Sequence, residues 1–284
     1  MLGKSLNTEA HDKVRRRSIA AAAAAAITMP WIGGCVSPSA ASEASVAQSR
    51  KTYVLVHGAY HGAWCWRDVA TRLQAQGHAV YTPTLTGLGE RSHLISFRPT
   101  LDTFVQDVMQ VLKFEDLNDV ILVGHSFAGS VVSGVGDQMP DRIRHLVYLD
   151  ALVLQSGQTS FDGLPADVVE RYRRQSTETS GGLSVPPPPP EYFGITNPEQ
   201  AAWLRRHLTP HPFGTYVSKL TLNHPVGNNL PATYIACSKP YFASTAKSRE
   251  FIRTTKWAYK EIPTAHDATL LMPSELTEIL GQIG

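Results

Sequence analysis

From residue 52 onward, the chain alternates between short apolar runs and longer segments with helical spacing. Residues 120–123 are apolar throughout, whereas residues 101–114 carry apolar side chains at intervals of three and four, which is typical of an amphipathic helix. Continuous apolar strands that alternate with helices predict a parallel sheet covered on both faces. The expected strands are residues 52–57, 78–82, 120–123, 145–149, 232–237 and 257–262, and the expected helices are residues 63–76, 101–114, 127–138, 244–254 and 273–283.

This alternation stops between residues 155 and 230. The segment contains Gly181-Gly182, five consecutive prolines from Pro186 to Pro190, and one helix-like stretch from Glu199 to His207. Five prolines in a row favour an extended polyproline conformation on an exposed surface. We therefore expect an α/β fold, with a mostly parallel doubly wound sheet and a cap of about residues 155–230 inserted after the sixth strand. In the alternative, the segment is an ordinary loop insertion.

Residues 1–50 are predicted to be an export signal followed by a tether. Arg15-Arg16-Arg17 precede seven alanines, Ala20 to Ala26, and this apolar part is far shorter than the ~20 residues of a membrane-spanning helix. Adjacent arginines before a weakly apolar run favour twin-arginine export. Residues 32–35, Ile-Gly-Gly-Cys, resemble a bacterial lipobox, so we expect a periplasmic protein or a lipoprotein anchored through Cys35. Alternatively, Cys35 has no such role and cleavage follows near residues 45–47.

The composition narrows the classes of partner. The chain has 284 residues, of which 43% are hydrophobic and 18% charged, with a net charge of +2, enough for one substantial core over residues 51–284. Because there is no basic field, we expect no nucleic-acid partner. Cys65 and Cys237 lie in apolar stretches and are expected to be buried free thiols. We expect neither a cofactor nor a metal, and the oligomeric state stays open.

The expected strand at residues 120–123 ends on Gly124-His-Ser-Phe-Ala-Gly129. Small residues around an isolated serine, between a buried strand and a helix, favour a nucleophile elbow of the G-x-S-x-G type. This places the Ser126 hydroxyl on a sharp turn at the carboxyl edge of the sheet. In the alternative, the glycines only soften a turn between a strand and a helix.

A serine nucleophile needs a base, and the base needs an acid. Among the eleven histidines, His266 lies in the loop after the last strand, where a hydrolase of this chain order carries its base. The loop after Cys237 has no carboxylate before Glu250, so we assign the acid to Asp150, which ends the strand after the nucleophile helix. In the alternative, Asp150 only caps its turn. Asp267 is disfavoured because it adjoins His266.

Backbone N–H groups of Phe127 and Ala59 are expected to form the oxyanion hole, and glycine at position 58 lets the backbone approach the substrate closely. Gly58, Tyr60 and Trp203 are predicted to contact the substrate. Because the cap is rich in aromatic residues, we expect an apolar substrate. Three further histidines that border the site are expected to be structural: His57, His61 and His125.

Five motifs carry a family resemblance: Tyr53-Val-Leu-Val-His-Gly-Ala-Tyr-His-Gly-Ala-Trp-Cys-Trp66, Gly77-His-Ala-Val-Tyr81, residues 120–129, Thr264-Ala-His266 and Leu208-Thr-Pro-His-Pro-Phe-Gly214. The first four together resemble the α/β-hydrolase branch of plant methylesterases and hydroxynitrile lyases, and the fifth is similar to bacterial esterases. The resemblance covers most of residues 53–284. It implies an α/β-hydrolase fold with its triad in the order serine, acid, histidine.

Within that branch, the lyases carry a threonine at position 58, a glutamate at position 125 and a lysine at position 267, where this chain has Gly58, His125 and Asp267. The resemblance therefore implies an esterase. The missing carboxylate after Cys237 departs from the usual pattern, although some haloalkane dehalogenases carry their acid where Asp150 stands. We expect a serine carboxylesterase that hydrolyses an apolar ester, aromatic esters included, through an acyl-enzyme. The alternatives are a C–C bond hydrolase and a hydrolase-fold ligand-binding protein with little turnover.

Overall fold

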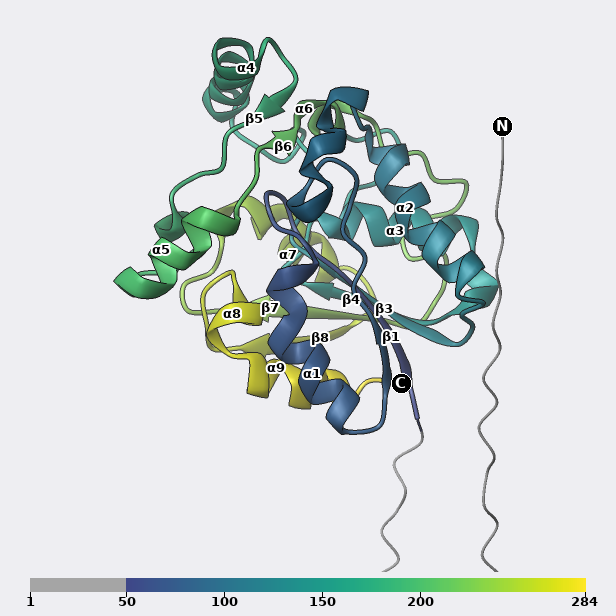
Figure 1. Ribbon diagram of the computed structural model, residues 1–284. Helices are drawn as coiled ribbons and strands as arrows, with labels where there is room; N and C mark the ends of the chain where they lie inside the picture. The colour runs from purple at the N-terminus through teal and green to yellow at the C-terminus, as the bar shows by residue number, and fades with distance from the viewer. Residues whose placement is uncertain (1–49) are drawn as a thin grey trace, which may run out of the picture. The chain divides into compact units, whose positions relative to one another are not determined.

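The computed structural model describes residues 50–284, so the predicted export signal and Cys35 lie outside the described residues. In the described part, six parallel strands form one sheet in the order β2-β1-β3-β4-β7-β8 (Figure 1). The strands are β1 (Thr52–Val56), β2 (Ala79–Tyr81), β3 (Val120–His125), β4 (Ile143–Leu149), β7 (Ala232–Cys237) and β8 (Ala258–Ile262). The mostly parallel doubly wound sheet expected from the sequence is confirmed.

Strand β3 shows how the sheet is covered on both faces. Val120 and Leu122 belong to one hydrophobic core, whereas Ile121 and Val123 belong to the other, as the two-residue period of a strand requires. Helices α2 and α3 cover the first face, and α1 and α9 cover the second (Figure 1). The helices outside the cap are α1 (Arg67–Ala75), α2 (Leu101–Phe114), α3 (Ala128–Gln138), α7 (Ala246–Ile252), α8 (Ala268–Leu271) and α9 (Pro273–Gly281).

Local sequence fixes the ends of these helices. At the start of α2, the Thr100 hydroxyl accepts from the Thr103 N–H, and the Thr103 side chain accepts from the Thr100 N–H in return. The chain leaves α1 through Gly77, which has φ +88°. Gly77 thus begins the connection from α1 to β2, and Thr100 ends the connection from β2 to α2.

The cap lies between β4 and β7, so it follows the fourth strand of the described chain, as the expected strand ranges imply, and not a sixth strand. Its elements are α4 (Ala166–Ser180), the antiparallel pair β5 (Ser184–Val185) and β6 (His211–Pro212), the 3₁₀ helix η4 (Pro190–Phe193), α5 (Pro198–His207) and α6 (Phe213–Val217). Helix α4 was not expected from the sequence. Within α4 only Ser176 is buried, so the helix has no broad apolar stripe to reveal it.

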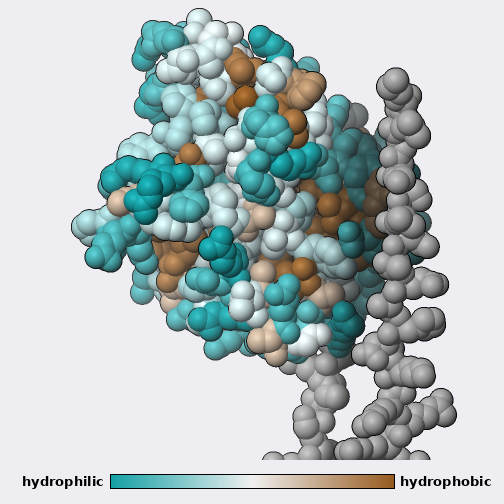
Figure 2. Space-filling view, viewed as in Figure 1, coloured by the Kyte–Doolittle hydropathy of each residue, from teal (hydrophilic) through white to brown (hydrophobic). Residues whose placement is uncertain are grey.

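The surface of the described part is mostly hydrophilic on the face shown in Figure 2, where hydrophobic side chains form separate patches. Tyr192 is a partly exposed aromatic residue at 39%. Cys65 and Cys237 are buried free thiols, as expected. Across residues 50–284, no helix is both long enough and apolar enough to span a membrane.

Candidate active site

Ser126 lies on the sharp turn between β3 and α3, with a positive φ of 55°. Its N–H donates to the Leu149 carbonyl at 3.1 Å, and its carbonyl accepts from the Leu152 N–H at 2.9 Å. A Cβ on Gly129 would lie 2.1 Å from the Leu152 carbonyl oxygen, so the turn requires glycine there. The last glycine position of the G-x-S-x-G pattern holds Ala128, and the glycine follows one residue later. The strained turn is held from both sides and presents a serine at the carboxyl edge of the sheet.

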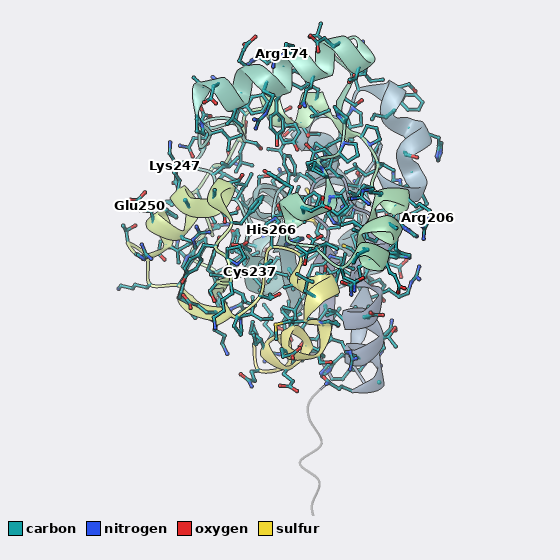
Figure 3. The ribbon with its side chains drawn as sticks, turned by 90° about the vertical axis from the view of Figure 1, so that its left-hand side faces the viewer. Arg174, Arg206, Cys237, Lys247, Glu250 and His266 are labelled. Atoms are coloured by element: carbon teal, nitrogen blue, oxygen red, sulfur yellow. The ribbon has the colours of Figure 1, made fainter. Side chains whose placement is uncertain are left out.

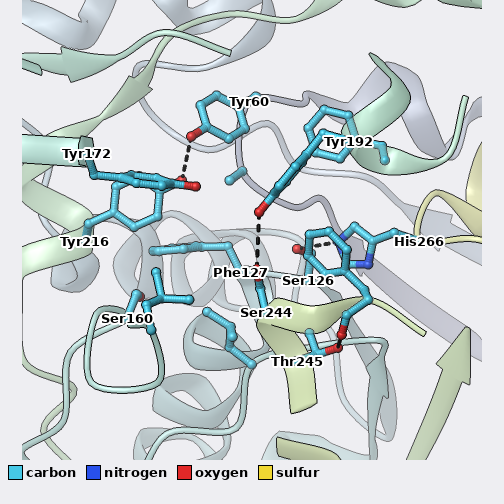
Figure 4. Close-up of a pocket in the computed structure, with 15 residues that line it drawn as sticks. Tyr60, Ser126, Phe127, Ser160, Tyr172, Tyr192, Tyr216, Ser244, Thr245 and His266 are labelled. Atoms are coloured by element: carbon cyan, nitrogen blue, oxygen red, sulfur yellow. Dashed lines mark hydrogen bonds between the residues drawn. The ribbon is translucent and has the colours of Figure 1, made fainter. Parts of the chain in front are cut away.

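His266 lies between Ser126 and Asp150, and Figure 4 shows its contact with Ser126. The Ser126 hydroxyl lies 2.8 Å from His266 Nε2, and His266 Nδ1 lies 2.7 Å from Asp150 Oδ2. Because a carboxylate can only accept, Nδ1 carries the proton and Nε2 accepts from the serine. Asp150 Oδ2 therefore lies within the ~2.6–3.2 Å reach that a triad acid needs. The structure brings together the three residues that the sequence singled out.

The His266 ring is clamped between two other rings. Phe242 stacks on it, with ring centroids 3.8 Å apart and an interplanar angle of 18°, and the His125 ring lies at 4.8 Å. His125 Nε2 donates to the His266 carbonyl at 3.0 Å. Burial lowers the pKa of His125 to about 3, so this ring stays neutral. Figure 3 shows His266 near the middle of the molecule, below the cap helix α4 that carries Arg174. The clamp fixes the orientation of the imidazole.

Asp150 is held by groups that sequence reasoning did not identify. Its own φ is +39°, and its N–H donates to the Ile235 carbonyl at 2.7 Å. The Thr245 hydroxyl donates to Asp150 Oδ1 at 3.0 Å, and Arg249 Nη1 lies 2.6 Å from Thr245 Oγ1 and 3.6 Å from Asp150 Oδ1. All three side chains are buried. Thr245 is 95 residues from Asp150 in the chain, and only the fold shows this proximity.

The turn after β1 brings backbone N–H groups to Ser126. Ala59 and Phe127 line the same pocket as Ser126, and within residues 50–284 neither of their amides donates to a protein acceptor. A Cβ on Gly58 would lie 2.9 Å from Ser126 Cβ and 3.3 Å from the His125 carbonyl. Glycine at 58 therefore allows this turn to approach the elbow. The two free donors suit an oxyanion that forms beside the serine.

The pocket above Ser126 measures about 500 Å³, part of it open to solvent. Tyr60, predicted from the sequence to contact the substrate, lines this pocket. Trp203 does not lie there: its ring stacks on His207 at 4.0 Å, and its side chain lines a separate depression beside α5. The residues that line the pocket are Ala59, Tyr60, Ser126, Phe127, Leu152, Ser160, Leu164, Tyr172, Tyr192, Phe193, Tyr216, Phe242, Ser244, Thr245 and His266 (Figure 4).

Sequence reasoning did not single out Tyr172, which lies on the unexpected helix α4. The spacing of Val168, Val169 and Tyr172, three to four residues apart and followed by Ser176, is a helical pattern that could have revealed it. The polar residues between them hide this pattern.

Asp267, His61 and His57 make hydrogen bonds to other groups of the protein, outside the triad. Asp267 Oδ2 lies 3.2 Å from His61 Nε2, so this carboxylate faces away from the triad. His57 Nδ1 donates to the Gly58 carbonyl at 2.9 Å, and His57 Nε2 accepts from the Leu85 N–H at 3.0 Å. In the described part of the chain, no group of three or more His, Cys, Asp or Glu residues could hold a metal ion.

The chain is similar to known proteins in sequence and in fold. The chain matches the Alpha/beta hydrolase family over residues 53–278. It is 36% identical over 246 residues to the Carbendazim hydrolyzing esterase of Nocardioides sp. (strain SG-4G), covering 82% of this chain and 99% of that protein. It is 33% identical over 132 residues to the Alpha-hydroxynitrile lyase of Arabidopsis thaliana, covering 46% and 48% of the two chains.

Among solved structures, an extracellular alpha/beta-hydrolase from a Paenibacillus species superposes with a TM-score of 0.72 and 27% identity. The match covers 82% of this chain and 99% of that one, and that structure is described as sharing structural and functional homology with Tobacco Salicylic Acid Binding Protein 2. Because the family match spans residues 53–278, the chain belongs to the Alpha/beta hydrolase family, and its similarity to esterases supports a hydrolase.

Proposed function

We propose that this protein is a serine carboxylesterase that hydrolyses apolar esters, aromatic ones included, through an acyl-enzyme. The observation that carries the proposal is the continuous contact of Ser126, His266 and Asp150 at the floor of an apolar pocket. A cofactor has no part in this chemistry, because the three side chains supply nucleophile, base and acid.

The proposed reaction has two halves. The Ser126 oxygen attacks the ester carbonyl carbon while its proton passes to His266 Nε2, and the oxyanion accepts from the N–H groups of Ala59 and Phe127. The intermediate then collapses, and His266 gives the proton to the departing alcohol. Water attacks the acyl-enzyme in the same way and releases the carboxylic acid and the free serine. Asp150 accepts from His266 Nδ1 and stabilises the imidazolium in both halves.

The geometry at Gly58 supports hydrolysis over lyase chemistry. The threonine that lyases carry at this position would place a Cβ 2.9 Å from Ser126 Cβ, which the present turn does not accommodate. Asp267, at the position of the lyase lysine, binds His61 and does not face the pocket. The similarity to the Carbendazim hydrolyzing esterase supports an ester hydrolase as well, and carbendazim belongs in the first panel of test substrates.

Pre-steady-state hydrolysis of 4-nitrophenyl acetate tests the proposal. We expect a burst of 4-nitrophenol followed by turnover, and Ser126→Ala should lower kcat by ~10⁴-fold or more. Ser133→Ala is the matched control, because it removes a buried hydroxyl from α3 outside the pocket. A Ser126→Ala variant with more than a hundredth of the wild-type rate would contradict the serine mechanism, and folded protein with neither burst nor turnover would indicate a binding protein.

We also propose export through the twin-arginine route, because residues 15–26 carry the arginine and alanine pattern. Replacing Arg16 and Arg17 by lysine in the full-length chain should leave the precursor in the cytoplasm of the expressing bacterium. Cys35→Ala should release the exported protein from membranes if the lipobox is used. If the mature form of the double-lysine variant appeared outside the inner membrane, the twin-arginine route would be ruled out.

A further inference from the structure

Four tyrosine side chains surround the part of the pocket that lies away from the sheet. Tyr60 follows the oxyanion turn, Tyr172 belongs to α4, Tyr192 to η4 and Tyr216 to α6. Figure 4 shows their hydroxyl ends directed toward the same space above Phe127. Four separate segments thus place phenol groups around one cavity.

Two hydroxyls of this cluster are joined by a hydrogen bond. The Tyr216 hydroxyl donates to the Tyr60 hydroxyl at 3.1 Å, and the Tyr172 side chain lines the same pocket. Tyr192 pairs with the Ser244 hydroxyl at 3.2 Å. Each phenol has one proton to donate, so the Tyr60 hydroxyl, which accepts from Tyr216, keeps a proton that it can donate into the pocket. None of the residues lining the described pocket is a carboxylate that could take it.

The backbone holds Tyr60 in this position against strain. Tyr60 has a positive φ of 68°, its carbonyl accepts from the Thr209 N–H at 2.9 Å, and its N–H donates to His211 Nδ1 at 3.4 Å. Residues in strained conformations persist where the surroundings fix them, and they cluster at functional sites. The hydroxyl of Tyr60 is therefore aimed before any ligand binds.

These phenols are neutral donors. Burial, and then the neighbouring tyrosines, raise the pKa of Tyr60, Tyr172 and Tyr216, so all three keep their protons at neutral pH. No lysine or arginine lines the described pocket. A carboxylate in this space would lose its hydration without gaining a counter-charge. A neutral acceptor, such as a ketone or a ring nitrogen, would accept the free proton at no such cost.

Ser160 provides a second, independent observation. It lines the same pocket, is 4% exposed, and its hydroxyl has no hydrogen-bond partner within the described residues. The adjacent Phe161 stacks on Tyr216 with ring centroids 5.5 Å apart and an interplanar angle of 7°. A buried hydroxyl without a partner is costly unless a ligand can satisfy it. The cap side of the pocket thus has unused hydrogen-bonding capacity at two places.

From these observations we propose that the ester substrate carries a neutral hydrogen-bond acceptor on an aromatic ring, and that the hydroxyls of Tyr60 and Tyr172, with Tyr216 bonded to Tyr60, recognise this acceptor at the cap side of the pocket. The proposal rests on the proposed esterase function and specifies its substrate class. The phenols are specificity-determining groups, whereas Ser126 and His266 do the chemistry. Aromatic walls from Phe127, Phe193 and Phe242 flank the space and suit a flat ring.

Two esters of the same shape test the proposal: methyl 3-(4-acetylphenyl)propanoate and methyl 3-(4-isopropenylphenyl)propanoate. They differ by C=O against C=CH₂ at the far end, and two methylene groups insulate the ester from this change. For the wild-type protein we expect kcat/KM to favour the acetyl ester by ~10-fold, the worth of one hydrogen bond. If either compound is not turned over, the ratio is taken from inhibition constants against 4-nitrophenyl acetate.

Variants then locate the donor. The double variant Tyr60→Phe/Tyr172→Phe should bring the ratio close to one, and Tyr172→Phe alone should lower it in part. Tyr148→Phe is the matched control, because it deletes a buried phenol hydroxyl bonded to Ser133 outside the pocket, and its ratio should equal that of the wild type. Circular dichroism and thermal unfolding check the fold of each variant, and the wild-type ratio is decisive even where a variant fails to fold.

A wild-type ratio near one, together with Ser126-dependent turnover of 4-nitrophenyl acetate, would overturn the proposal and leave the esterase function intact. Such a result would mean that the phenols bond to water only. A ratio unchanged in the folded double variant would equally overturn it, as would faster hydrolysis of the 4-carboxylate analogue than of the acetyl ester. Absence of any Ser126-dependent turnover would overturn the esterase function and this proposal together.

Discussion

Two buried histidine–aspartate pairs lie next to each other in this structure, one formed by His266 with Asp150 and the other by His61 with Asp267. The nitrogen-to-oxygen distances are 2.7 Å and 3.2 Å, and all four side chains are nearly inaccessible to solvent. The aspartate of the second pair directly follows the histidine of the first. Composition and burial therefore do not distinguish them.

The second ring nitrogen distinguishes the pairs. His266 Nε2 faces the Ser126 hydroxyl, which can donate, so one proton on the ring satisfies both neighbours. His61 Nδ1 faces the Ala59 carbonyl at 2.8 Å, which can only accept, so both nitrogens of His61 need protons. Burial lowers the pKa of His61, but the Asp267 carboxylate raises it more, and the net pKa is raised. In the first pair the ring keeps an acceptor nitrogen for the Ser126 hydroxyl, whereas the second is an ion pair that supports the oxyanion turn at Ala59.

The largest expected difference is in turnover. Asp150→Asn should lower kcat by ~10³- to 10⁴-fold, because His266 loses the group that fixes its tautomer and stabilises its cation. Asp267→Asn should lower kcat by less than ~10-fold, since its partner does not contact the ester. Steady-state kinetics on folded variants make the comparison. A fall of less than tenfold in Asp150→Asn would mean that a backbone carbonyl or water near Ser238 orients His266 instead.

A smaller effect on kcat is expected at Thr245, which hydrogen-bonds to Asp150 and not to His266. Thr245→Val keeps the shape of the side chain but removes the hydroxyl that donates to Asp150 Oδ1, so kcat should fall by ~10-fold. Thr245→Ser should restore most of the rate because it keeps the hydroxyl. A valine variant as fast as the serine variant would exclude a positioning role for Thr245.

The smallest expected effect is on the pH dependence of thermal stability, which distinguishes the His61–Asp267 pair. A raised folded-state pKa means that His61 stabilises the protein below its unfolded value of ~6.5, and that this stabilisation is lost as pH rises through the folded value. In Asp267→Asn, burial would lower the pKa of His61, as it does for His125, and only the hydrogen bond to the Ala59 carbonyl would oppose it, so we expect the fold to lose stability as pH falls. The difference in Tm between wild type and variant should therefore widen from pH 8 to pH 5.5.

The matched control for this measurement is Asp107→Asn. Asp107 accepts from the N–H and the hydroxyl of Thr86 and pairs with Arg91, and no histidine among residues 50–284 bonds to it, so its Tm difference should stay constant over the same range. A constant or narrowing difference for Asp267→Asn would show that His61 is not held as a cation.

The sheet and the three side chains that meet at its carboxyl edge could be predicted from the sequence, for a physical reason. Strands buried on both faces have continuous apolar runs, and parallel strands end at one edge, so Ser126, Asp150 and His266 could be placed there from their positions alone. Helix α4 was not predicted because few of its side chains are buried. Tyr172 is the residue of α4 that lines the pocket. The prediction that Trp203 contacts the substrate was wrong, because an aromatic residue in a cap can pack on another aromatic ring as readily as on a substrate.

The hydrogen bonds that tie the Ser126 backbone to Leu149 and Leu152 have a mechanical consequence. Asp150 lies between those two residues, so the nucleophile and the acid belong to one clamped unit built from the ends of β3 and β4. His266 comes from a separate C-terminal segment. A local opening of that segment would carry away the base together with Asp267, the partner of His61, while Ser126 and Asp150 stay held at the strand ends, and reclosing would have to restore both histidine–aspartate pairs.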